Sequence, residues 1–377
     1  MMKMKVCVVG IGYIAEKNIE LFKAKHSVSI YVPYPISVEE SMSLRSRTGA
    51  VPIYYDPTTL SSIDLFVICL ELPYNDVKQN VVMERFLEVS QAIRRFAHSG
   101  STVIVETKLS IGSTRKYFTG VDVHCSYSPS VITHDSTNTE IVEKSIKLVG
   151  GLDEESELLA MQFLETIYNN VIRTGTPEVA EAVVMLNAAQ VTVQEALINE
   201  FADFCDTVDL DVHQVIDAAS VGDNRDKRVK LPWIGRKCDN DSSLTMSSHT
   251  DRWPILSVAS GRLTTRPSKI YKQIVERFCK GNFDKLHKMA FLVVGVGTTI
   301  GSSDMTDSPV LEIIRYLEME GAAVSKYDMF VDKYSKLPVL KYNSGKCKFD
   351  GILVMHPYMT QTWKNEYGNL TMYFCRH

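Results

Sequence analysis

The sequence predicts an α/β protein in which an N-terminal Rossmann-like doubly wound domain and a C-terminal Rossmann-like domain flank a central helical segment. Three observations support this fold. An apolar run that ends in glycines opens a strand–helix pattern at residues 6–15, and a second such run, MAFLVVGVG, begins at residue 289. Between them lies a long segment with apolar residues at helical spacing. A chain of 377 residues also exceeds the ~250–300 residues at which single cores stop growing.

In the first domain, which we place at 1–175, short β-branched runs alternate with helical patterns. The strand candidates are KVCVV, VSIYV, DLFVICL, TVIVE, VHCSY, IKLVGG and VIRTG. Continuous apolar runs of this length are typical of a parallel sheet covered by helices on both faces. Residues 77–97 repeat apolar side chains at three- and four-residue spacing, which predicts a helix between two strands. This alternation indicates a doubly wound domain.

The central helical segment, which we place at 176–283, begins with a helix start signal. Thr176 is suited to cap a helix whose first residue is Pro177. The pattern then stays helical to about residue 219. Residues 179–198 are apolar on most faces, and such a helix is normally buried, either within the protein or between subunits. Both alternatives remain open.

The chain from residue 220 onward passes through a long loop into the C-terminal domain, which we place at 284–377. Residues 220–253 are polar and turn-rich, and a further helix is expected at about 267–281. The strand MAFLVVGVG then leads to an amphipathic helix, SPVLEIIRYLEMEG, which Gly321 ends. The segments AAVSKYDMFV and FDGILVMH are the later strands.

Composition excludes several classes of function. The formal net charge of −4 gives no basic footprint for nucleic acid or an anionic membrane surface. The eight cysteines include no CxxC pair and no zinc-finger spacing, so neither a metal site nor a disulfide framework is expected. No stretch approaches the ~20 apolar residues of a membrane span, and the opening MMKMKVCVVG is interpreted as a first strand. These features predict a cytoplasmic protein.

The motif VCVVGIGYIA at 6–15 is the clearest candidate binding element. Gly10 and Gly12 stand where a strand turns into a helix, as a tight turn against a pyrophosphate requires, and Ala15 takes the third glycine position. An acidic residue after the second strand would hold the adenine ribose, but Val32 stands there. The motif therefore predicts dinucleotide binding that is weakened or differently arranged, or a Rossmann scaffold without NAD.

Several further landmarks follow one another in a fixed order. They are PIYYDP at 52–57, ETKLSIGST at 106–114, SYSPS at 126–130, KLVGG at 147–151, AEAVVMLNAAQVTVQEALINE at 180–200, LDVHQVIDAA at 210–219 and SPVLEIIRYLEMEGAAVSKYD at 308–328. Together with GIGYIA, they make the chain resemble the UDP-glucose/GDP-mannose dehydrogenase family over nearly its whole length.

The resemblance implies a nucleotide-sugar 6-dehydrogenase of the UDP-glucose or UDP-N-acetylmannosamine type. Members of that family use NAD to oxidise a sugar alcohol to a carboxylate through a thiohemiacetal and a thioester on one cysteine. The resemblance also implies a nucleotide-sugar substrate and a homodimer formed through the 179–198 helix. The cofactor-binding residues that it implies are Gly10, Gly12, Tyr13, Ile14 and Gly112.

The central helix departs from the family pattern at the residues that stabilise the oxyanion. Glu181 matches the acidic start of the family motif and Glu200 its end, at the same separation. In that register the family lysine falls on Val184 and the family asparagine on Ala188. Asn187 is one position away, which rotates its side chain by about 100°. A valine cannot donate to an oxyanion, which argues against the family reaction.

The family cysteine lies in a glycine-rich loop that corresponds here to LPWIGRKCDND. Cys238 and an aspartate, Asp241 or Asp239, are retained, while most glycines are gone. Arg236 and Lys237 would lower the pKa of the Cys238 thiol and keep a reactive thiolate available. The alternative is a surface cysteine with no chemical role.

Lys108 stands where the family has a threonine, in ETKLSIGST. The family positions of Lys108 and Val184 border the same active site, so this lysine is a candidate to replace the missing ammonium. The alternative is a surface or scaffold lysine. Our candidate catalytic residues are therefore Cys238, Asp241 and Lys108.

Two more departures affect the substrate site. The family glutamate after the proline of SYSPS is Ser130. The family lysine and arginine that bind the nucleotide sugar from the C-terminal domain fall on Thr299 and Thr306. The sequence thus predicts a diverged homologue whose catalysis is impaired, a pseudoenzyme. The alternatives are an active NAD-dependent enzyme that uses Cys238, a nucleotide-binding module without turnover, and an assembly protein that reuses the fold.

Overall fold

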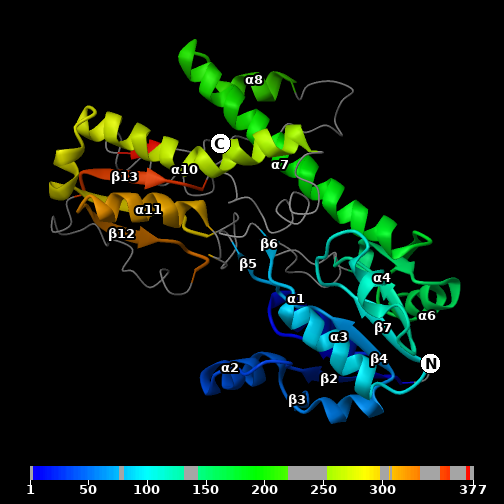
Figure 1. Cartoon of the computed structure of the whole chain (residues 1–377). Helices are drawn as coiled ribbons and strands as arrows, with labels where there is room; N and C mark the ends of the chain where they lie inside the picture. The colour runs from blue at the N-terminus through cyan, green and yellow to red at the C-terminus, as the bar shows by residue number, and fades with distance from the viewer. Residues whose placement is uncertain are drawn as a thin grey trace. The chain divides into compact units, whose positions relative to one another are not determined.

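The computed structural model describes residues 3–75, 80–130, 143–219, 253–297, 305, 308–331, 349–356 and 371–373. They form two compact units (Figure 1). Among the described residues, the N-terminal unit comprises those up to Ala188 and the C-terminal unit those from Ala189 onward. The three-part division at 175 and 283 stays a prediction.

The N-terminal unit alternates strands and helices, as predicted. Its elements are β1 (Lys5–Val9), α1 (Tyr13–Lys23), β2 (Ser27–Tyr31), α2 (Val38–Thr48), β3 (Ile53–Tyr54), η1 (Pro57–Ser62), β4 (Leu65–Ile68), β5 (Tyr74–Asn75), β6 (Asn80–Val81), α3 (Glu84–Phe96), β7 (Ser101–Val105), α4 (Ser113–Phe118), β8 (Val123–Tyr127), β9 (Ile146–Gly151), α6 (Glu154–Leu164) and β10 (Asn170–Arg173).

Eight of these strands form one sheet in the order β10-β9-β8-β7-β4-β1-β2-β3. All neighbouring pairs are parallel except β8 and β9, which run antiparallel. The predicted parallel sheet is therefore confirmed, with one antiparallel pair that the sequence did not indicate. The strand order reverses between β4 and β1, and open α/β sheets bind ligands at such a switch point.

Alternate residues of each strand pack against helices on opposite faces of this sheet. On β1, Val6 and Val8 join the core formed with α1 and α6. Cys7 and Val9 join the core formed with α3 and α4. Both faces are therefore buried, which explains why central strands such as β1 (KVCVV) and β4 (LFVI) are nearly continuous apolar runs.

The helix predicted at 77–97 begins later than expected. Residues Asn80–Val81 pair antiparallel with Tyr74–Asn75 as a small two-stranded sheet, and α3 starts only at Glu84. Backbone pairing in this sheet takes the place of the first helical turns, so the periodic pattern overstated the length of the helix.

The C-terminal unit contains the last part of α7 (Pro177–Thr207), a helix shared between the units, and a second α/β arrangement. Its other elements are α8 (Val212–Ala219), α10 (Pro254–Cys279), η3 (Phe283–Lys288), β11 (Ala290–Val294), α11 (Pro309–Met319), β12 (Ala323–Tyr327), β13 (Gly351–Val354) and β14 (Thr371–Tyr373). The four strands form a parallel sheet in the order β12-β11-β13-β14. Helices α10 and α11 pack on one of its faces.

Helix α10 is longer than predicted. We expected a helix at about 267–281, but α10 begins at Pro254 and contains Pro267 in its interior. A proline inside a helix removes one backbone hydrogen bond. Buried Leu263 and Ile270, on either side of Pro267, pack into two hydrophobic clusters of this unit and hold the helix together across it.

Candidate functional site

The first glycine-rich turn joins β1 to α1 at the switch point of the N-terminal sheet. Gly10 has a φ of 110° and donates its N–H to the Tyr31 carbonyl at 2.9 Å. A Cβ added at Gly10 would lie 2.8 Å from the backbone oxygen of Cys69. Gly12, with a φ of 129°, directly precedes α1. Both positions therefore require glycine, as the motif predicted.

Tyr13 and Ile14 form the first turn of α1. Both are half-buried and pack against the core cluster that contains Ala15 and Ile19. The N-cap residue of α1 is Gly12, which has no side chain to cap the helix, and the first backbone N–H groups of α1 face the turn. These groups are the parts of the turn suited to a phosphate, and a cofactor role for the two side chains stays a prediction.

The position after β2 is apolar and enclosed. Val32 is 1% exposed and belongs to the same core cluster as Val6 and Ile30. A carboxylate at this place would be buried. The Tyr34 side chain, two residues on, packs against both N-terminal cores. The structure thus fills the side of the turn where a ribose would be held.

A carboxylate lies against the turn from the other side. A Cβ added at Gly12 would lie 2.2 Å from the Glu71 Oε1 atom and 2.7 Å from its Cδ. Glu71 follows β4, the strand paired with β1 on the far side from β2. Nothing in the sequence pattern singled out this glutamate, because the contact joins segments about sixty residues apart.

The residues around this turn match an NAD site only in part. The backbone at Gly10 and Gly12 fits a pyrophosphate, but the surrounding side chains do not. An apolar Val32 stands where the ribose would need an acceptor, and the Glu71 carboxylate occupies the side where the pyrophosphate would bring negative charge. The described residues do not form a complete NAD site.

The loop after β7 carries the predicted Lys108 and Gly112. Lys108 is exposed. Gly112 has a φ of 84° and caps α4 on its N-terminal side. Its N–H donates to Glu181 Oε2 at 2.6 Å, and Thr114 donates its N–H and hydroxyl to Glu181 Oε1 at 2.9 and 2.7 Å. The described role of Gly112 is thus to hold Glu181.

These contacts fix the start of α7 against the N-terminal unit. Glu181 is completely buried, and burial raises its pKa although the hydrogen bonds from Thr114 and Gly112 favour the charged form. One turn earlier, Glu178 accepts from the Arg115 guanidinium at 2.6 and 3.2 Å. Two glutamates three residues apart therefore set both the position and the rotation of the helix.

Val184 lies one turn beyond Glu181 on the same side of α7. It is half-buried and packs against the core cluster that includes Ala180. The helix runs unbroken from Pro177 to Thr207, so Glu181 and Val184 lie on one continuous helix. The correspondence of this helix to the family motif stays a prediction. Asn187 is exposed, as expected for a residue rotated away from this side. An apolar side chain therefore occupies this position of α7.

A buried charged network lies beneath the first turn and was missed by sequence reasoning. Lys147 and Glu106 are 0% and 1% exposed and pair at 2.5 Å. The Asn18 amide of α1 donates to the other oxygen of Glu106 at 2.6 Å, and the Cys69 thiol lies 3.6 Å from it. Lys147 also donates to the Pro129 carbonyl at 3.0 Å. The network ties α1, the end of β4 and strand β9 together.

The predicted catalytic loop lies outside the described residues. This loop contains Cys238 and Asp241. The substrate-site positions Thr299 and Thr306 are also outside the described residues, so the roles of all four stay predictions. Five described cysteines are buried: Cys7, Cys69, Cys125, Cys205 and Cys279. Burial raises the pKa of Cys7 to about 12 and that of Cys69 and Cys125 well above the usual range. None of these three thiols is suited to form a thiolate nucleophile.

The second glycine-rich turn follows β11 in the C-terminal unit. Gly295 has a φ of 87°, and an added Cβ would lie 2.2 Å from the His356 ring. The buried Asp328 carboxylate accepts the N–H groups of Val296 and Gly297 at 2.8 and 3.1 Å. His356 lies 3.0 Å, through Nε2, from the Gly297 carbonyl. This turn is thus bound by side chains of its own unit.

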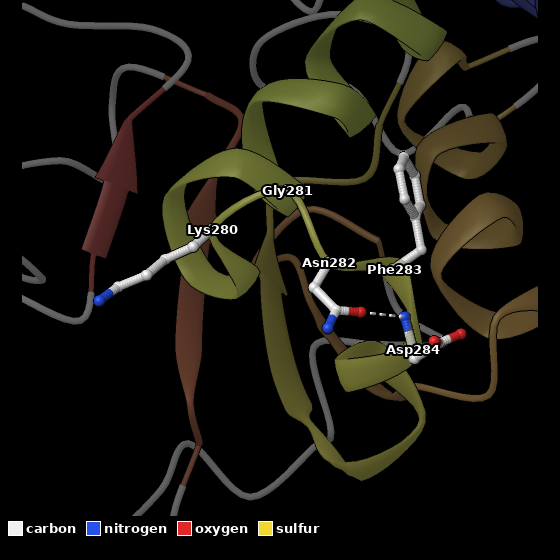
Figure 2. Close-up of a pocket in the computed structure, with 5 residues that line it drawn as sticks. All are labelled: Lys280, Gly281, Asn282, Phe283 and Asp284. Atoms are coloured by element: carbon white, nitrogen blue, oxygen red, sulfur yellow. Dashed lines mark hydrogen bonds between the residues drawn. The ribbon is translucent and has the colours of Figure 1, made fainter.

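A shallow pocket lies apart from both turns, at the junction of α10 and η3, and is lined by residues 280–284 (Figure 2). Asn282 Oδ1 accepts the N–H of Asp284 at 3.0 Å, which caps η3. The Lys280 side chain extends away from the other lining residues. The pocket is a helix-end turn that brings no reactive groups together.

Among the described residues, no helix has the length and apolar character needed to cross a bilayer. In the same part of the chain, no three histidine, cysteine, aspartate or glutamate side chains gather as a metal site would require.

Comparison with known sequences gives a consistent set of relatives. No protein-family model matches the chain. The UDP-N-acetyl-D-mannosamine dehydrogenase of Methanococcus maripaludis strain C7 is 22% identical over 355 residues, which cover 87% of this chain and 80% of the relative. The enzyme of the same name from Pyrococcus horikoshii is 23% identical over 362 residues, covering 87% and 84%.

Solved structures agree on the fold. A UDP-D-ManNAc dehydrogenase structure from Pyrococcus horikoshii matches with a TM-score of 0.79 at 19% identity, covering 98% of this chain and 94% of that one. A UDP-glucose dehydrogenase from Pyrobaculum islandicum matches with a TM-score of 0.75 at 15% identity, covering 94% and 90%. The chain therefore has the Rossmann-like α/β fold of these dehydrogenases, and its relatives consistently point to the UDP-sugar dehydrogenase family, as the resemblance predicted.

Proposed function

We propose that this chain is a diverged UDP-sugar dehydrogenase homologue that binds a nucleotide or nucleotide sugar without carrying out the NAD-dependent oxidation. The relatives named UDP-N-acetyl-D-mannosamine dehydrogenase support the ligand class, because the resemblance to them extends over most of the chain. The loss of turnover is proposed from the residues around the start of α7.

The observation that carries the proposal is the packing of Val184. Contacts of Glu181 with Gly112 and Thr114 fix the register of α7, so the side chain three residues later points back to the N-terminal core. An isopropyl group has no donor for a developing oxyanion, and removing one such donor lowers kcat by roughly 10²–10³. Lys108 does not replace it in this proposal, because its side chain is exposed.

The test is to incubate the full chain with NAD and a panel of UDP- and GDP-sugars. Calorimetry should show binding of at least one sugar nucleotide, and NADH should not form. The control is Cys238→Ser, which removes the thiol that the family reaction would need. NADH production by the wild-type chain that disappears in Cys238→Ser would show that the chemistry survives, and absence of any sugar-nucleotide binding would favour an assembly role.

We also propose that the chain forms a homodimer through α7. Large apolar side chains are exposed along the second half of this helix, where Leu197 is 68%, Phe201 38% and Phe204 55% exposed. An apolar helix face of this kind is typical of a subunit interface. Light scattering should give a dimer for the wild type and a monomer for Phe204→Glu. Exposed Met42 of α2, changed to glutamate, serves as the control and should leave the dimer intact.

A further inference from the structure

We propose that Glu71 is an internal anion that occupies the first glycine-rich turn and sets the chain's affinity for dinucleotides. The inference rests on the proposed nucleotide-binding role of this scaffold, and it names the residue that weakens its cofactor site. In this view the turn keeps its ancestral backbone, but a carboxylate of the chain itself stands where the pyrophosphate of NAD would approach.

The geometry of the sheet brings Glu71 to this place. Strand β4 pairs with β1 in parallel, with Ile68 opposite Val9, so the segments that follow both strands emerge at the same edge. Gly12 and Glu71 each lie three residues beyond this pair. The Glu71 carboxylate occupies space that any side chain at Gly12 would need, since three of its atoms lie within 3.3 Å of an ideal Cβ there.

The electrostatics favour a carboxylate at the turn and disfavour a second anion. Gly12 directly precedes α1, and the N-terminus of a helix carries a partial positive charge that attracts one negative group. A pyrophosphate drawn to the same N–H groups would meet the Glu71 charge. Two unit charges about 4 Å apart in water repel enough to change an equilibrium about fivefold, and more where solvent is excluded.

Glu71 can be displaced, so its effect is competition and not complete exclusion. Its side chain is exposed, and the atoms closest to Gly12 are the far end of a flexible chain. On the opposite side of the turn, next to β2, the side chains are more tightly packed. Tyr34 packs against both cores, and the Arg85 guanidinium lies 4.1 Å above its ring. Changing Glu71 alone should therefore alter phosphate binding and leave the Tyr34 side unchanged.

The experiment compares three probes on the full chain: NAD, ADP and adenosine. Calorimetry is done on the wild type, on Glu71→Gln, which keeps the shape and removes the charge, and on Glu71→Ala. Glu165→Gln removes the same charge from an exposed residue at the end of α6 and is the matched control. Glu71→Gln and Glu71→Ala should bind NAD and ADP at least about fivefold more tightly than the wild type, with adenosine unchanged.

Three results would overturn the inference. The first is an unchanged or weaker affinity for NAD in both Glu71 variants. The second is an equal gain in affinity for adenosine, which would mean that the Glu71 side chain acts by its size and not by its charge. The third is an equal gain in affinity for NAD in Glu165→Gln. Failure of the proposed function is seen separately, as NADH production or absent sugar-nucleotide binding in the wild type, and neither depends on Glu71.

Discussion

The two glycine-rich turns of this chain share a backbone and differ in the side chains that hold them. In the first, the Gly10 N–H donates to the Tyr31 carbonyl at 2.9 Å, and in the second, the Gly295 N–H donates to the Tyr327 carbonyl at 2.8 Å. The residue after each of these tyrosines therefore occupies an equivalent position in the two turns. It is Val32 in the first turn and Asp328 in the second, and both residues are 1% exposed.

This difference shows two ways of stabilising one backbone. In the C-terminal unit, the Asp328 carboxylate accepts the N–H groups of the turn directly. In the N-terminal unit, Val32 packs in an apolar core. The charged groups near this turn come from other strands: Glu71 lies against the turn, and the pair of Glu106 and Lys147 lies beneath it. A short glycine-rich turn of this shape thus leaves its side-chain partners free to vary.

The largest effect is expected from breaking the buried network of the first turn. Lys147→Met leaves the Glu106 carboxylate buried without its cation, and removing one partner of a buried ion pair typically costs about 3–5 kcal/mol. The free energy of unfolding of the N-terminal unit should fall by that amount, measured by hydrogen exchange of β7 and β9. Lys17→Met, which breaks the exposed pair with Glu20, is the control and should cost less than about 1 kcal/mol.

An intermediate effect is expected from Asp328, which holds the second turn. Asp328→Asn replaces a carboxylate that accepts three backbone N–H groups, including that of Phe330, and hydrogen bonds to a charged group contribute about 1.5–3 kcal/mol each. We expect a loss of about 2–3 kcal/mol in the C-terminal unit. Tryptophan fluorescence during denaturation measures it, because all three tryptophans lie after residue 188.

The control for Asp328 is an aspartate of the same unit in a different setting. Asp350 accepts a single N–H, that of Ala290 at 2.8 Å, at an exposed place. Asp350→Asn should change stability by less than about 1 kcal/mol. Equal losses in the two variants would mean that Asp328 has no special role in the turn.

Much of the fold could be predicted because it depends on local pattern. The buried strands are continuous apolar runs, and glycines follow β1 and β11 where the chain must turn with a positive φ. The errors came where pairing or packing overrode the pattern. Residues 80–81 join a small sheet in place of a helix, and α10 passes through Pro267. Nothing in the sequence of β9 indicated that it pairs antiparallel with β8.

The candidate site also has a part that the sequence predicted and a part that it did not. The register from Glu181 to Val184 could be predicted, because both residues lie on one helix whose motif has a fixed spacing. Glu71 and Lys147 could not, because each acts across the sheet on residues far away in the sequence. Contacts of this kind depend on strand order, which local patterns do not specify.

The smallest expected effect is a pH dependence of stability that comes from His356, a residue of the second turn. Burial lowers the pKa of His356 below its usual value, although the Gly297 carbonyl and Asp328 favour the charged form. The unfolded chain therefore takes up a proton before the folded chain does as pH falls below about 6.5.

His356 thus stabilises the C-terminal unit at neutral pH, and this contribution is lost as pH falls toward the lowered pKa. The slope cannot exceed about 1.4 kcal/mol per pH unit for one proton. His356→Gln should flatten the pH dependence of tryptophan-detected unfolding below about pH 6.5. His287, which lies at the exposed end of η3, is the control, and His287→Gln should leave the slope unchanged. A slope that persists in His356→Gln would assign the titration to another group and leave His356 as a packing residue against Gly295.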